Sequence, residues 1–144
     1  PGAVLSGEAD AGLIIHETRF TFRSMGLTMV ADTGAMWEKM TGLPVPLGGI
    51  VISRNIDPFV ASKVERAIRR SIEYARSSPR ESVDFIRQHA RETDAEVTRE
   101  HIKLYVNDFS LSLGEEGRRA IEKLFSVALE KGVANPLPAS IFLK

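Results

Sequence analysis

Helix-start signals recur along the last two-thirds of this 144-residue chain, and they constrain its fold more than any other feature. Asp57-Pro58 places a capping side chain before a proline, the residue most suited to a first helical turn. Three Ser/Thr-x-x-Glu capping boxes follow, at Ser78–Glu81, Thr93–Glu96 and Ser112–Glu115. The pattern predicts four helices before Gly132, the first of which runs to about Ser77.

The first third of the chain carries short apolar segments instead. Ala11–Ile15 and Gly48–Ile52 are too short for helices and indicate buried strands, while Leu27–Val30 indicates a strand or a loop. Between them, Asp32 and Gly42 bound a predicted helix. We therefore predict an α/β protein, with residues 1–52 as an α/β segment and residues 53–144 as a helical region.

Two or three strands are too few for a stable sheet, so this α/β reading requires more protein than the chain shows. One economical arrangement is a bilobal ligand-binding fold in which residues 48–52 cross between lobes. The chain also begins with Pro1 rather than Met. We expect a first lobe to be encoded upstream and the helical region to pack against it.

Composition excludes several classes of function. Nineteen basic and nineteen acidic residues cancel, so no overall field attracts nucleic acid or an anionic membrane, although a small charged metabolite needs only a local patch. The absence of cysteine excludes thiolate catalysis and disulfides and leaves His, Asp and Glu as metal ligands. No apolar run approaches the roughly 18 residues that span a bilayer, and we expect a cytoplasmic protein.

His16 ends the first apolar segment, where α/β proteins place ionisable groups. An imidazole accepts protons near neutral pH with little tuning, so His16 is either a general base or a hydrogen-bonded structural histidine. Glu17 follows it, and neighbours on a strand point to opposite faces, which argues against direct contact. Gly48 and Gly49 either let a ligand approach the backbone or form a tight hinge.

The other aromatic and histidine side chains have structural interpretations. His89 and His101 lie on either side of a helix boundary without a metal-binding motif, and we expect them to face solvent or cap helices. Tyr105 lies on an apolar helix stripe, so the core is its expected place, and a cleft is the alternative.

Five sequence blocks occur in one order across nearly the whole chain: Gly12–Glu17, Arg19–Thr21, Asp32–Gly34, Thr41–Gly49 and His101–Asn107. In this order they resemble the 1,4-dihydroxy-6-naphthoate synthase family, and the sister family, chorismate dehydratase, is a weaker match. The resemblance implies a type 2 periplasmic-binding-protein fold. It also implies a lyase of the futalosine route to menaquinone, which converts cyclic dehypoxanthine futalosine to 1,4-dihydroxy-6-naphthoate and dihydroxyacetone.

The resemblance also assigns roles to residues. It implies that His16 is the proton acceptor that triggers carbon–carbon cleavage, with no cofactor and no metal. We expect Glu17, Leu47, Gly48 and Gly49 to contact a small-molecule carboxylate substrate, and we expect the chain to need the missing N-terminal lobe for activity. Two alternatives remain: a non-catalytic solute-binding module of the same fold, and a helical interaction domain in which His16 is incidental.

Overall fold

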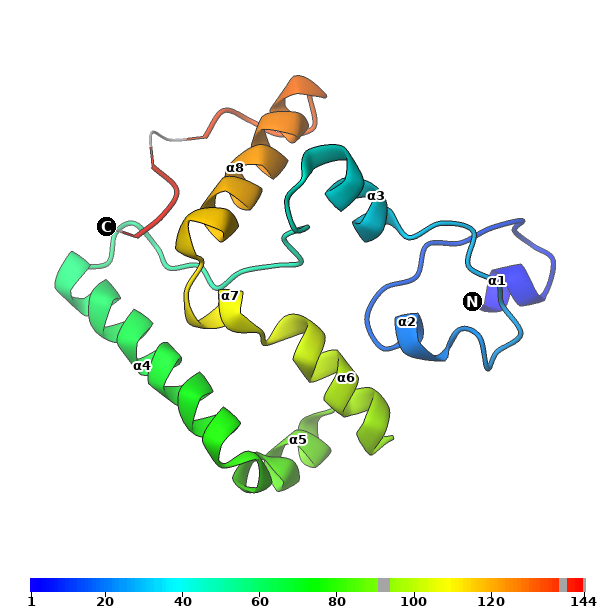
Figure 1. Ribbon diagram of the computed structural model, residues 1–144, viewed down its shortest axis with the longest axis horizontal. Coiled ribbons are helices and arrows are strands. Elements are labelled where there is room, and N and C mark those ends of the chain that lie inside the picture. The colour runs from blue at the N-terminus through cyan, green and yellow to red at the C-terminus, as the bar shows by residue number, and fades with distance from the viewer. Residues whose placement is uncertain (91–93, 138–139, 144) are drawn as a thin grey trace.

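The computed structural model describes residues 1–90, 94–137 and 140–143, and every regular element in these ranges is helical. The elements are α1 (Gly2–Leu5), α2 (Thr18–Thr21), α3 (Thr33–Thr41), α4 (Pro58–Ser77), η1 (Pro79–Ser82, a 3₁₀ turn), α5 (Val83–His89), α6 (Ala95–Tyr105), α7 (Asp108–Leu111) and α8 (Gly114–Glu130). They form an open frame (Figure 1), in which α4 contacts η1 and α7, and the N-terminal segment reaches α6 through α2. None of the described helices is long and apolar enough to cross a membrane.

The predicted α/β fold is wrong, because the described residues contain no strand. The three segments predicted as strands or loop have no regular secondary structure, and no ladder of backbone hydrogen bonds joins any of them to another segment in the described ranges. Leu13, Val30 and Val51, one from each, are 83%, 91% and 92% exposed. A short apolar run becomes a strand only when a partner strand pairs with its backbone. The chain therefore does not adopt the type 2 periplasmic-binding-protein-like fold that was expected.

Helices α3 and α4 begin and end where the sequence predicts. Oδ1 of Asp57 accepts hydrogen bonds from two free N–H groups in the first turn of α4, at 2.9 and 3.2 Å, and this helix ends at Ser77. Asp32 caps α3 in the same way, and Gly42 ends that helix with a φ of 69°, a left-handed conformation that suits glycine. Both helices are thus specified by residues at their own ends.

Two of the predicted capping boxes do not form, although their helices do. Ser78 makes no capping hydrogen bond, and the carboxylate of Glu81 instead accepts a hydrogen bond from the hydroxyl of Tyr74 on α4. A 3₁₀ turn therefore precedes α5. Ser112 is also not a cap, because α8 begins at Gly114 without any side-chain cap. A box pattern shows which residues are able to cap a helix, and tertiary contacts decide whether they do.

The third box falls partly outside the described residues, since Thr93 is not among them. Asp94 caps α6, where its Oδ1 accepts N–H groups at 2.8 and 3.0 Å. A reciprocal capping box does form at α7, a helix that the sequence did not predict. There Oδ1 of Asn107 accepts a hydrogen bond from the N–H of Phe109 at 3.0 Å, and Oγ of Ser110 accepts one from the N–H of Asn107 at 3.1 Å.

Few side chains are buried, although 43% of the residues are hydrophobic. The buried residues of the described ranges are Phe22, Ala61, Gly117 and Ala120. At Gly117 a Cβ atom would lie 3.1 Å from the ring of Phe109, so a larger residue would require this ring to shift by a few tenths of an ångström away from α8. The helices therefore meet at small contacts, and most of their apolar surface remains open.

Candidate functional site

His16 has an unusual backbone conformation. Alone among the non-glycine residues that the structure describes, it has a positive φ, of 56°. The left-handed region costs an L-residue roughly 1–2 kcal/mol, because its Cβ crowds the following carbonyl oxygen. Such strain persists only where surrounding contacts enforce it, and it is concentrated at functional sites. The side chain of His16 is exposed, so the strain does not serve to bury the ring.

The ring of His16 lies beside two rings of α6. Its centroid is 6.1 Å from that of His101 and 6.2 Å from that of Tyr105, with the Tyr105 ring inclined by only 29°. His101 and Tyr105 themselves lie 4.7 Å apart, centroid to centroid. They are four residues apart on α6 and so share one face of that helix. The three rings form one cluster between the segment that precedes α2 and α6.

Glu17 connects the same two segments through a hydrogen bond. Nδ1 of His101 lies 3.0 Å from Oε1 of Glu17, and these side chains are 24% and 34% exposed. A hydrogen bond from its own backbone N–H, together with the neighbouring imidazole of His101, lowers the pKa of Glu17. The carboxylate is therefore ionised near neutral pH and acts only as an acceptor, so Nδ1 of His101 donates.

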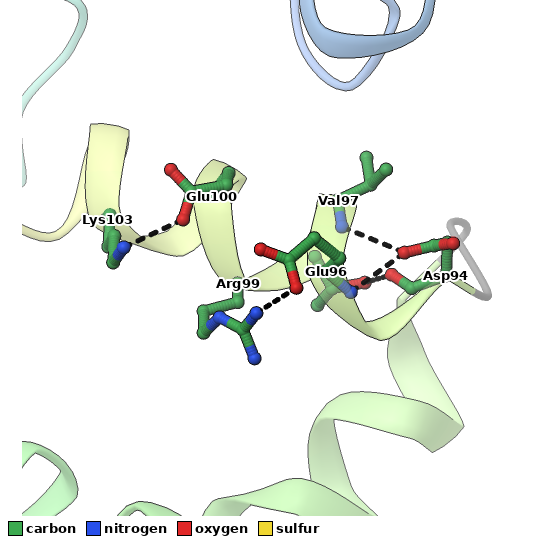
Figure 2. A network of polar contacts seen from close by, with 7 residues as sticks. Asp94, Glu96, Val97, Arg99, Glu100 and Lys103 are labelled. Carbon is green, nitrogen blue, oxygen red and sulfur yellow. Dashed lines mark hydrogen bonds and ion pairs between the residues drawn. The ribbon is translucent and has the colours of Figure 1, made fainter.

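Charged pairs stabilise the helix that carries these rings. Figure 2 shows Asp94 at the start of α6, an ion pair between Glu96 and Arg99, and a second pair between Glu100 and Lys103. The N–O distance of the second pair is 2.7 Å. Exposed pairs at this spacing stabilise a helix weakly, and the cap contributes about 1 kcal/mol. Together they favour the helical conformation that sets His101 and Tyr105 side by side.

The other predicted site residues lie elsewhere. Leu47, Gly48 and Gly49 are in the irregular loop after α3, and nothing lies within 4 Å of the position that a Cβ would take at either glycine. Across the described ranges, no hydrogen bond, ion pair or ring contact joins this loop to His16. The structure thus brings His16 and Glu17 to α6 and leaves the glycine loop separate.

Sequence reasoning missed the part of the site that α6 supplies. The expectation that His101 faces solvent or caps a helix is wrong, since it donates to Glu17. The same expectation is confirmed for His89, whose Nδ1 lies 2.8 Å from the carbonyl oxygen of Phe85 at the end of α5. The sequence signal that could have identified this part of the site is the four-residue spacing of His101 and Tyr105, which places both rings on one face of a helix. The described residues contain no group of three or more side chains able to hold a metal ion.

The fold and this site define a helical protein that sets a strained, exposed imidazole beside a carboxylate–histidine hydrogen bond, an arrangement suited to proton transfer. The chain belongs to the menaquinone biosynthesis family, whose model matches residues 1–130. This confirms the family indicated by the sequence blocks.

Two relatives of known name are similar to almost the whole chain. It is 47% identical over 140 residues to a 1,4-dihydroxy-6-naphtoate synthase of Thermus thermophilus, and 42% identical over 135 residues to a protein of the same name from Streptomyces coelicolor. The alignments cover 97% and 94% of this chain, but 52% and 48% of the relatives. The chain therefore spans about half the length of the curated relatives it matches.

Proposed function

We propose that the chain is part of a carbon–carbon lyase of the futalosine route to menaquinone. The enzyme converts cyclic dehypoxanthine futalosine to 1,4-dihydroxy-6-naphthoate and dihydroxyacetone. The observation that carries the proposal is the 47% identity, over 97% of this chain, to a protein named for that naphthoate. The family's role in menaquinone biosynthesis supports the same route, and a biosynthetic role of this kind supports a cytoplasmic location.

His16 is the general base in this proposal. Its exposed imidazole removes a proton from the substrate, the carbon–carbon bond to the three-carbon fragment breaks, and the remaining ring becomes aromatic. A positioned side chain that accepts a proton in the transition state contributes about 10²–10⁴-fold to a rate. The strained backbone of His16 and its place beside α6 support this role.

Leu47, Gly48 and Gly49 contact the substrate in the same proposal. Both glycines are exposed, and nothing lies within 4 Å of the position that a Cβ would take at either, which supports a close approach of the substrate to this loop. Glu17 was expected to bind substrate as well, but its carboxylate already accepts a hydrogen bond from His101. The negative charge of Glu17 would also repel an anionic substrate. In this proposal Glu17 therefore acts on the substrate through its neighbours rather than by direct contact.

An N-terminal lobe completes the site in this proposal. Two observations support it: the relatives are about twice as long as the aligned part, and large apolar side chains of this chain are exposed. Single exposed apolar residues are ordinary, but contiguous patches mark contact surfaces. Val60 and Val64, on the apolar stripe of α4, are 46% and 41% exposed.

Product formation from cyclic dehypoxanthine futalosine tests the proposal. The chain is assayed alone and with the N-terminal lobe, as wild type, as His16→Ala and as the matched control His89→Ala. We expect naphthoate only when the lobe is present, a loss of product in His16→Ala and wild-type rates in His89→Ala. If no folded combination makes product, the lyase assignment fails. If substrate binds without turnover, a solute-binding module is the better assignment.

A further inference from the structure

We propose that His101 is a positioning residue for His16. Through its hydrogen bond to Glu17, it holds the peptide that follows His16 and so maintains the left-handed backbone that directs the imidazole toward the substrate. The inference rests on the proposed function, because it assigns His16 as the base. It adds a residue of α6 to a site that the sequence placed in the first third of the chain.

The argument begins with the conformation of His16. A left-handed L-residue reverts to an extended or right-handed conformation unless its neighbours are fixed. On the N-terminal side, the segment from Ala11 to Ile15 has no regular secondary structure and makes no backbone hydrogen bonds to another segment in the described ranges. The restraint therefore comes from the C-terminal side, where the carbonyl of His16 accepts the N–H of Arg19 at 3.1 Å.

Glu17 supplies the long-range part of that restraint. It directly precedes α2, with φ of −60° and ψ of −31°, and its side chain reaches α6 rather than capping its own helix. A hydrogen bond between Glu17 and His101 fixes the start of α2 relative to α6. Because Glu17 and His16 share a peptide bond, this also restricts rotation at His16.

His101 is itself held from two sides. Its Nδ1 donates to Glu17, and its ring lies 4.7 Å from that of Tyr105 at an interplanar angle of 58°. Tyr105 in turn lies beside the ring of His16. Two contacts therefore fix the position of the His16 imidazole. One is the restraint on its backbone through Glu17, and the other is the contact of its ring with the rings of α6. His101 takes part in both.

Two substitutions separate the hydrogen bond from the ring. His101→Asn keeps an N–H donor near the position of Nδ1, whereas His101→Phe keeps a flat ring against Tyr105 and removes the donor. In the protein with its N-terminal lobe, we expect His101→Phe to lower kcat by about 10- to 100-fold with KM changed less than about twofold. We expect His101→Asn to retain kcat within about threefold of wild type.

A measurement that needs no turnover keeps this test separate from the proposed function. The NMR three-bond coupling between HN and Hα of His16 reports its φ. We expect it to move to the value of extended backbone in His101→Phe and to stay at the wild-type value in His101→Asn, with the helix content of both unchanged. An absence of product in the wild type would reject the lyase assignment and leave the coupling result interpretable.

The contact between Glu17 and His101 also predicts that the losses of activity caused by substitutions at these two residues are not additive. Glu17→Leu removes the acceptor, so the double variant with His101→Phe is expected to lose no more than either single variant. The inference is overturned if His101→Phe keeps wild-type kcat and His16 coupling. It is also overturned if both His101 variants lose activity while the coupling stays unchanged, because His101 would then act on the substrate itself.

Discussion

The guanidinium Nη2 of Arg19 lies 2.6 Å from Oδ2 of Asp32, while Oδ1 of the same carboxylate caps α3. One side chain thus joins α2, which directly follows the candidate site, to the start of α3. The hydrogen bond from Arg19, with that from the N–H of Ala35, holds the pKa of Asp32 below its usual range. The ionised carboxylate is therefore the form that the fold favours.

Because the pKa of Asp32 is lowered in the folded protein, we predict that the contribution of Asp32 to the free energy of unfolding depends on pH. Asp32→Ala removes cap and ion pair and is expected to cost about 1 kcal/mol, while Asp32→Asn keeps a cap and costs less than about 0.5 kcal/mol. Since the folded-state pKa lies below the unfolded one, the contribution of the charge is fully present above about pH 3.9. It disappears as the pH falls through the folded value. Urea unfolding of wild type and Asp32→Asn from pH 7 to pH 2 measures this, and a gap that persists at pH 2 would contradict it.

We predict that two substitutions of His16 differ in their effect on stability but not in their effect on activity. His16→Gly and His16→Ala both remove the imidazole, but only glycine adopts a φ of 56° without strain. We expect the glycine variant to be about 1 kcal/mol more stable than the alanine variant, and both to be inactive. Chemical denaturation of the two variants gives the difference. Equal stabilities would mean that His16 is not held in the left-handed region.

Gly117 predicts a loss of stability on a substitution that normally favours helices. Alanine is better than glycine inside a helix by about 1 kcal/mol, but its Cβ here would lie 3.1 Å from Phe109 and 3.2 Å from Leu113. Overpacking of this kind costs about 1–3 kcal/mol, so we expect a net loss of about 1 kcal/mol. Gly2→Ala in α1, where nothing lies within 4 Å, is the matched control and is expected to be neutral or stabilising. A stabilised Gly117→Ala would show that Phe109 moves aside freely.

Two residues that the sequence marks as helix caps are predicted to behave differently. Asp57 accepts two backbone N–H groups of α4, whereas Ser112 makes no cap at α8. We expect Asp57→Ala to cost about 1 kcal/mol and Ser112→Ala to change stability by less than about 0.3 kcal/mol. Thermal unfolding of both variants measures the contrast. A similar cost at Ser112 would mean that the sequence pattern described α8 better than the structure does.

The sequence predicted the longer helices of this chain, but not α2 or α7, because the signals of the longer helices are local. Asp57, Asp32 and Gly42 act within one turn of the helix that they bound, so neighbouring residues suffice to identify them. The strands failed for the opposite reason. Whether Ala11–Ile15 pairs depends on a second segment elsewhere, and an apolar run alone does not show that such a partner exists.

The candidate site divides in the same way. His16 and Glu17 were found from the sequence because they end an apolar run and lie in a recognisable block. His101 and Tyr105 were missed because their role depends on how α2 packs against α6, which no local pattern contains. The division of the chain at residue 52 stays a prediction. The cluster contains residues from both sides of that division, since His16 precedes residue 52 and His101 and Tyr105 follow it.

The hydrogen bond between Glu17 and His101 has a consequence for folding. It joins residues far apart in the chain, and contacts of this kind form late because the intervening loop must first be closed. Helices α3, α4 and α6 are capped by residues at their own ends and can form earlier. A folding intermediate with native helix content is therefore expected to be enzymatically silent, so recovery of turnover during refolding lags behind recovery of the far-ultraviolet signal.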